Sequence, residues 1–144
     1  KVRGHAGNPG LLSEADLAGY RALERTPLCF EHRRHRICGM PPPSSGTLAI
    51  AQVMGLLADR DLAALPPLHA PWGLEAAPEA VHLISEAERL AFADRNRYVA
   101  DPDFVPVDTA AMLDDDYLRR RAALIGERSM GRAVPGPHVR WRIP

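Results

Sequence analysis

Two cysteines flank two histidines in the first third of the chain, in the order Cys29, His32, His35 and Cys38. These residue types bind zinc in many proteins. A hairpin with a two-residue loop between the histidines would, however, put the histidine pair and the cysteine pair on opposite faces. The four residues also lack the long spacer that normally separates two metal-binding pairs. We therefore expect a structural hairpin over about 27–40, with a zinc site or a cross-strand disulfide as the alternatives.

Acidic residues gather at two further places, and each place has a structural explanation. Asp101 and Asp103 begin like a calcium-binding loop, but Pro106 and Met112 stand where such a loop needs glycine and glutamate. The three aspartates at 114–116 suit the positively charged N-terminus of a helix. We expect a β-turn at the first place and a helix start at the second, and a cation site is the less favoured reading of both.

One acid and two serines remain as candidates for catalysis. Asp94 falls on the apolar stripe of a predicted helix, so we expect a buried, paired structural carboxylate, with a catalytic role as the alternative. Ser44 and Ser45 precede a predicted helix, but the Gly-x-Ser-x-Gly pattern of a nucleophile elbow is absent. No phosphate-binding glycine pattern occurs either. We assign no catalytic, substrate-binding or metal-binding residue and no cofactor.

The composition excludes several classes of protein. The length of 144 residues predicts one domain, and 18 basic against 18 acidic residues argue against a nucleic-acid binder. Lys1 is the only lysine, so Schiff-base chemistry would have to use that residue. The start carries no apolar run typical of a signal peptide, and the longest apolar stretch, 48–58, is shorter than the ~18 residues of a membrane span. The cellular compartment stays unassigned.

The elements that must position these residues are mostly helices. Ser13 begins a capping-box-like helix that ends near residue 23. Further helices are predicted over 46–58, 78–98 and 114–126 from their apolar periodicity and end signals. The helix over 46–58 is apolar nearly all round and must be buried in a core or against a partner.

The segments between these helices are less regular. The proline-rich stretch 61–78 is predicted as a loop. In the hairpin, Glu31 would face Arg36 as an ion pair, whereas arginines at 33–34 are poor residues for a two-residue turn. The fold class expected from these elements is mainly α with a small β-hairpin.

Several motifs are informative as an ordered set. The most distinctive are Pro-Pro-Pro-Ser-Ser-Gly at 41–46 and Glu-Ala-Glu-Arg-Leu-Ala-Phe-Ala-Asp-Arg at 86–95. In order and spacing the set resembles the gamma-glutamyltransferases (gamma-glutamyltranspeptidases), and the resemblance covers roughly residues 2–135. The remaining members of the set are 11–20 with 24–27, Tyr98, 101–107, 117–118 and 121–125.

The resemblance implies a fold, a place in the protein and a reaction. These segments are similar to the C-terminal, helical part of the family's large subunit, within an N-terminal-nucleophile hydrolase (αββα) fold. It implies a helical segment at 1–126 and an irregular tail at 127–144 that leads toward the processing site. Family precursors cut themselves, and the new N-terminal threonine transfers the γ-glutamyl group of glutathione-like donors to water or amino acids without a cofactor. The alternatives are a related amide acylase of the cephalosporin acylase type and a non-catalytic helical scaffold or interaction module.

The nucleophile that the resemblance implies is not in this chain. Thr26, Thr47 and Thr109 are the only threonines, and none has the Thr-Thr-His or Thr-Ser-His context of the family's cleavage site. We therefore expect an isolated chain without activity, a missing small subunit as its partner, and self-association of the lone chain. Arg34 and Thr47 stand where the family often has glycine, and we interpret 137–144 as an altered reading frame or a natural early stop.

Overall fold

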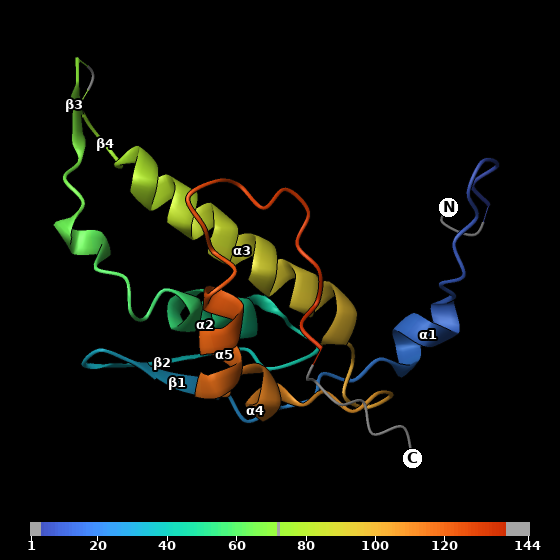
Figure 1. Cartoon of the computed structure of the whole chain (residues 1–144). Coiled ribbons are helices and arrows are strands. Elements are labelled where there is room, and N and C mark those ends of the chain that lie inside the picture. Colours follow the sequence, from blue (N-terminus) through green and yellow to red (C-terminus); the bar gives the residue numbers. More distant parts are fainter. Residues whose placement is uncertain (1–3, 72, 138–144) are drawn as a thin grey trace.

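The computed structural model describes residues 4–71 and 73–137, and the fold is mainly helical. Among the described residues, three helices have eight residues or more, and two antiparallel hairpins accompany them (Figure 1). The elements in chain order are α1 (Glu14–Gly19), β1 (Leu28–His32), β2 (His35–Gly39), α2 (Gly46–Leu56), the 3-10 helix η1 (Leu62–Ala64), β3 (Leu68–Ala70), β4 (Gly73–Glu75), α3 (Pro78–Tyr98), α4 (Thr109–Met112) and α5 (Asp115–Ala122). The predicted long helix over 78–98 is confirmed at both ends.

The core lies where α2 packs against both α3 and α5 (Figure 1). Buried apolar side chains recur along α3 at helical spacing, which gives that helix one face toward the core. The helices approach closely where a Cβ on Gly55 would overlap the Leu118 side chain. The core side chains of α2 and α3 are Leu48, Leu56, Leu83, Ala87, Leu90 and Ala91, and Met112, Tyr117 and Leu118 cover them from α4 and α5.

Helix α2 is covered on most of its circumference, which fits its apolar composition. Both strands of the first hairpin also pack on it. Ile50 is its one large apolar side chain that stays half exposed, at 51%. The prediction that this helix must be buried is therefore met largely within the chain.

The first hairpin has the predicted register, and its cysteines correct the favoured interpretation. Arg33 adopts the positive φ of 55° that the two-residue loop requires, although arginine is a poor residue for it. Cys29 and Cys38 face each other and form a disulfide, which was the least favoured alternative in the sequence. Glu31 and Arg36 form the expected cross-strand pair, at 4.0 Å between Oε1 and Nε.

Three other predictions about regular structure were wrong in part. The segment 61–78 is not only a loop, because β3 and β4 pair in it as a second, antiparallel hairpin. The helix predicted over 114–126 ends at Ala122, and α4 precedes it as a separate turn. The helix that begins at Ser13 ends at Gly19, well before residue 23.

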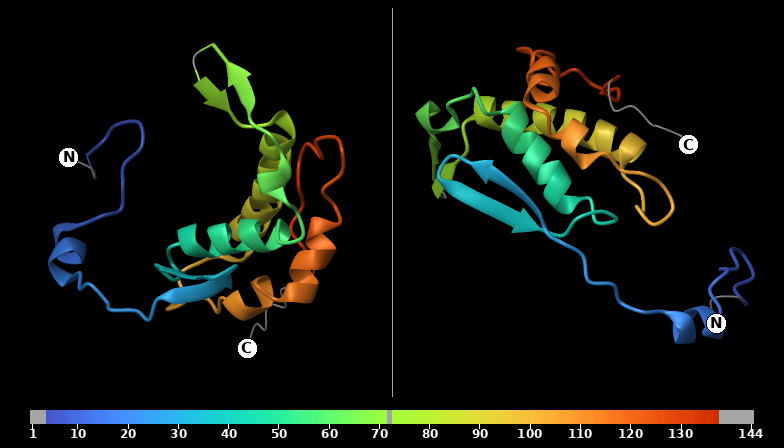
Figure 2. Two further views of the ribbon diagram at one scale, coloured as in Figure 1. Left: turned by 90° about the vertical axis from the view of Figure 1, so that its left-hand side faces the viewer. Right: turned by 90° about the horizontal axis from the view of Figure 1, so that it is seen from below.

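The segment before the first hairpin stands apart from the helical body. Figures 1 and 2 show α1 and its flanking chain extending away from the other elements. The capping box at its start is formed, since the Ser13 side chain accepts the Asp16 N–H and Asp16 accepts the Ser13 N–H. No side chain of α1 is buried. In the part of the chain that the structure describes, no helix is both long enough and apolar enough to cross a membrane.

Candidate functional site

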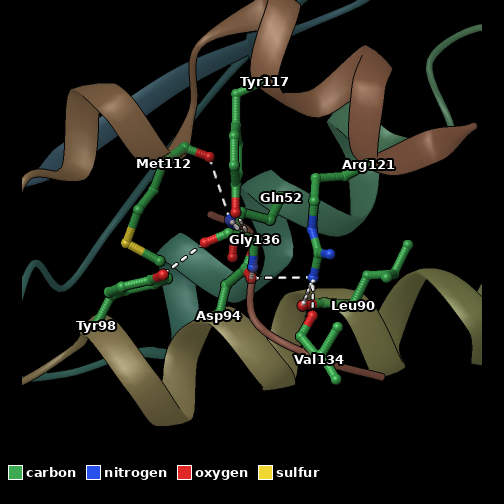
Figure 3. Close-up of polar contacts among 9 residues, drawn as sticks. All are labelled: Gln52, Leu90, Asp94, Tyr98, Met112, Tyr117, Arg121, Val134 and Gly136. Atoms are coloured by element: carbon green, nitrogen blue, oxygen red, sulfur yellow. Dashed lines mark hydrogen bonds and ion pairs between the residues drawn. The ribbon is translucent and has the colours of Figure 1, made fainter. Parts of the chain in front are cut away.

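Asp94 lies at the centre of a buried polar cluster between α3, α2 and α5. This residue is 1% exposed, and the sequence predicted its burial from its position on the apolar stripe. One carboxylate oxygen accepts from Arg121 Nη2 at 3.0 Å and from the Gly136 N–H at 2.8 Å. The other accepts from the Tyr117 hydroxyl at 2.6 Å and from Gln52 Nε2 at 3.3 Å (Figure 3). Four donors from three other segments therefore converge on one carboxylate.

Arg121 supplies the positive charge that balances Asp94. It is 4% exposed, and its Nη2 also donates to the carbonyl oxygens of Val134 at 2.8 Å and Leu90 at 3.4 Å (Figure 3). A buried ion pair with these added hydrogen bonds recovers much of the cost of removing both charges from water. Its loss on one side only would leave the remaining charge unpaired in the core.

Two tyrosine hydroxyls enclose Gly136 on the far side of the cluster. Tyr98 donates to the Gly136 carbonyl at 2.5 Å (Figure 3). A Cβ on Gly136 would overlap the Tyr117 hydroxyl, so glycine is needed there for the chain to approach so closely. Burial, and next the hydrogen bond to Asp94, raise the pKa of Tyr117 well above its ordinary value. Tyr117 therefore stays a protonated donor to the carboxylate.

Glu86 is a second buried acid on α3, two turns before Asp94. It is 1% exposed and accepts from the Met130 N–H at 2.7 Å and from the Ser129 hydroxyl at 3.0 Å. Arg89 approaches it with Nε at 3.1 Å and donates from Nη1 to the Gly131 carbonyl at 2.8 Å. Burial acts to raise the pKa of Glu86, but these hydrogen bonds and the charge of Arg89 outweigh it and lower that pKa below its ordinary value. Glu86 is therefore held in its charged form.

The cluster holds segments of this chain together and is not arranged as a catalytic site. The carboxylate of Asp94 already accepts four hydrogen bonds, so it has little capacity left to act as a base. Within the described ranges 4–71 and 73–137, no group of three or more His, Cys, Asp or Glu side chains is placed to hold a metal ion. The expectation of a buried, paired structural carboxylate at Asp94 is confirmed.

Sequence reasoning missed the partners of these two acids. Arg121 lies 27 residues from Asp94, and Met130 lies 44 residues from Glu86. Helical periodicity locates a residue on the inner face of its own helix, but it carries no information on which distant segment meets that face. An acid on an apolar stripe signals only that some donor must be near.

The other candidates have structural roles. The Asp101 carbonyl accepts from the Phe104 N–H at 3.0 Å, which confirms the predicted β-turn, and Asp101 Oδ1 accepts the Asp103 N–H. Asp114 caps α5 by accepting the Tyr117 N–H at 2.8 Å. His32 and His35 lie across from each other, on the face opposite to the disulfide.

The serine pair shows no catalytic arrangement. Ser45 precedes α2 without capping it by its side chain and accepts from Arg95 Nε at 2.8 Å, while Ser44 is exposed. Thr47 fits because Gly39 leaves room for its hydroxyl: a Cβ on Gly39 would overlap it. We therefore place neither serine in a reaction.

Comparison with known proteins identifies the class to which this arrangement belongs. Residues 2–140 match the gamma-glutamyltranspeptidase family. Among curated proteins, the glutathione hydrolase proenzyme of Escherichia coli is 36% identical over 92% of this chain and 21% of its own length. The acylase ACY 1 proenzyme of Pseudomonas sp. (strain V22) is 42% identical over 83% of this chain and 20% of its own length.

A solved structure gives the same result. The gamma-glutamyltranspeptidase of Helicobacter pylori superposes with a TM-score of 0.69 at 30% identity, over 90% of this chain and 34% of that one. The chain therefore belongs to the gamma-glutamyltranspeptidase family. It spans about a fifth of the length of the curated relatives that it matches.

Proposed function

We propose that the full-length protein is a gamma-glutamyltransferase, or glutathione hydrolase, that transfers the γ-glutamyl group of glutathione-like donors to water or to amino acids. The observation that carries this proposal is the family match along 2–140, supported by a glutathione hydrolase relative at 36% identity. The nucleophile is an N-terminal threonine outside this chain. No catalytic residue is assigned among residues 1–144.

Within that enzyme, this chain supplies scaffold from the helical part of the large subunit of an N-terminal-nucleophile hydrolase (αββα) fold. Residues 1–126 form the helical segment, and 127–144 lead toward the processing site. The description of the relatives as proenzymes supports a precursor that is cut on maturation. The partner of this segment is the small subunit that carries the nucleophile. Of the segment 137–144, which the sequence singled out as departing from the family, residues 138–144 lie outside the described residues, and the family match reaches residue 140.

Hydrolysis of a chromogenic γ-glutamyl anilide tests the reaction. The full-length protein should release the aniline, whereas the 144-residue chain should show no turnover above background. Turnover by the isolated chain that Ser44→Ala or Ser45→Ala abolished would overturn the proposal, because it would place the nucleophile within this segment. Absence of turnover by a full-length protein that has been cut into two subunits would also contradict it.

An acylase of the cephalosporin acylase type is the second candidate. The acylase ACY 1 relative, at 42% identity, favours it. Both candidates break an amide bond by the same type of nucleophile, so the difference lies in the substrate. Assaying the full-length protein with the γ-glutamyl anilide and with a cephalosporin side-chain amide in parallel decides between them by the ratio of the two kcat/KM values.

The third candidate, a helical interaction module, rests on exposed apolar surface. A groove of about 780 Å³ is bordered by the first hairpin, α2, α3 and α5, and its lining includes the apolar side chains of Phe30, Met54 and Ile84. Exposed apolar patches promote association in water. We expect the lone chain to form dimers or larger species in light scattering at micromolar concentration, and a clean monomer would contradict this expectation.

A further inference from the structure

Residues 129–136 form no helix or strand, yet their backbone is held at several points by side chains of the body. Figure 1 shows this segment running back over α3 after the end of α5. Its N–H groups at Met130 and Gly136 donate to the buried acids, and its carbonyls at Gly131, Val134 and Gly136 accept from arginines and a tyrosine. Five main-chain groups in seven residues therefore have partners on α3 or α5.

The side chains of the segment contribute much less. Val134 is 66% exposed, Ser129 and Arg132 are exposed, and Met130 and Ala133 are only partly buried. A segment held by the hydrophobic effect would bury its apolar side chains. This one is instead held by charge-assisted hydrogen bonds to its main chain, which are about twice as strong as neutral ones.

The contacts also set the direction of the segment. Glu86, Arg89 and Asp94 follow one another along α3, and they meet Met130, Gly131 and Gly136 in the same order. The anchors at Glu86 and Asp94 are about 12 Å apart along the helix axis at ~1.5 Å per residue. The six Cα–Cα steps from Met130 to Gly136 could span about 20 Å if extended, so the chain reaches both anchors with some slack.

We propose that Glu86, Asp94 and Arg121 form a peptide clamp that reads the main chain of residues 129–136 and so sets the point from which the chain after Gly136 departs. This clamp is a positioning device rather than a catalytic one. Its consequence rests on the proposed function: in the full-length precursor, the chain that leads toward the maturation cleavage starts from the clamped Gly136. Release of the clamp would then slow maturation without altering the mature reaction.

Limited trypsin digestion of the 144-residue chain tests the clamp directly. Arg128 and Arg132 lie before and inside the clamped segment, and the hairpin arginines at 33–34 serve as an internal reference. Glu86→Gln keeps the shape of the side chain but removes its charge. We expect cleavage after Arg132 to rise by about tenfold, because a hydrogen bond to a charged group is worth ~1.5–3 kcal/mol, while cleavage at 33–34 stays constant.

A matched control and a second variant make this test decisive. Glu88→Gln changes an exposed acid on the same helix and should leave both rates unchanged. Arg89→Gln removes the contact to the Gly131 carbonyl and the ion pair with Glu86, and because the Arg89 side chain is 47% exposed we expect the fold to be retained. We expect it to accelerate cleavage after Arg132 as well. Unchanged cleavage after Arg132 in both Glu86→Gln and Arg89→Gln would overturn the proposal. Equal acceleration of cleavage at 33–34 would overturn it too, because it would indicate general unfolding.

The full-length precursor tests the consequence for maturation. Glu86→Gln should slow the appearance of the two mature subunits by several-fold, and γ-glutamyl anilide hydrolysis per mature molecule should equal that of the wild type. Equal maturation rates would overturn the positioning role. If the wild-type precursor is never cut, the proposed function fails while the trypsin result still decides on the clamp, so the two failures are distinguishable.

Discussion

The two ends of the described chain, residues 4–27 and 127–137, differ in how they meet the helical body. The N-terminal segment contains a capped helix, α1, but buries none of its side chains, and Leu11 and Leu17 are 90% and 71% exposed. Near its end, Arg25 forms an ion pair with Asp103 of the loop after α3, at 2.6 Å. The C-terminal segment has no helix, but buried acids and arginines of α3 and α5 bind its main chain.

This difference shows that a segment can form regular local structure without being docked on the helical body. The capping box at Ser13 satisfies helix-end donors within α1 and so favours the helix, but it contributes nothing to docking. Attachment needs buried apolar area or buried polar groups that only a second segment can satisfy. At the C-terminal end Asp94 and Glu86 create that need, because a buried carboxylate is costly until donors reach it.

The largest effect on this comparison is expected from Asp94→Asn. The change leaves Arg121 buried without its counter-charge and weakens the contact to the Gly136 N–H. We expect a loss of about 3–5 kcal/mol in the free energy of unfolding, measured by urea titration. Asp115→Asn, at an exposed position with no such partner, is the control and should change stability little. A loss below 1 kcal/mol for Asp94→Asn would show that the cluster does not stabilise the fold.

A smaller effect is expected where the C-terminal segment passes closest to α5. In Gly136→Ala the added methyl group would overlap the Tyr117 hydroxyl, whereas at Gly126 nothing lies within 4 Å of the added atom. Crowding in a packed site costs ~1–3 kcal/mol. We expect Gly136→Ala to lower the urea midpoint and Gly126→Ala to leave it close to that of the wild type. Equal urea midpoints for the two variants would mean that the segment can move away from Tyr117 on α5 without a loss of stability.

Sequence periodicity predicted the parts of the fold whose signals are local. The long helix was located at both ends, because Pro78 marks its start and an apolar stripe runs through to Tyr98. The register of the first hairpin followed from its alternating pattern, despite unsuitable loop residues at 33–34. Both signals lie within a few residues of the structure that they predict.

The missed parts depend on contacts between distant residues or on very short elements. The second hairpin has strands of only three residues inside a proline-rich stretch, too short for an alternating pattern to be distinguished from a loop. The register places Cys29 opposite Cys38, but the sequence alone left a structural hairpin, a zinc site and a disulfide open. The partners of Asp94 and Glu86 required the tertiary structure.

Acid should release the C-terminal segment from the helical body. The pKa of Glu86 lies below its ordinary value of 4.5 in the folded chain, so its contribution to stability is present above pH 4.5 and is lost as the pH falls through the lowered pKa. We expect hydrogen exchange of the amides at 129–136 to lose protection in that acidic range, relative to exchange at neutral pH. Glu86→Gln removes the titrating group and should abolish this dependence while protection is lower throughout. An identical acid profile in the variant would assign the transition to another group.

The smallest effect is expected from Arg25→Ala, which removes the ion pair that ties the N-terminal segment to the loop after α3. Arg25 also lies 3.8 Å from Asp101, and the hydrogen bond to Asp103 raises the pKa of Arg25, so the guanidinium is charged at every pH of interest. Exposed ion pairs nevertheless contribute little to stability, because water solvates both partners when they separate. We expect an unchanged urea midpoint and equally fast hydrogen exchange at 4–23 in the variant and the wild type. Substantial protection of 4–23 in the wild type that the variant lost would mean that one surface ion pair docks this segment, and the contrast between the two ends would then be one of degree.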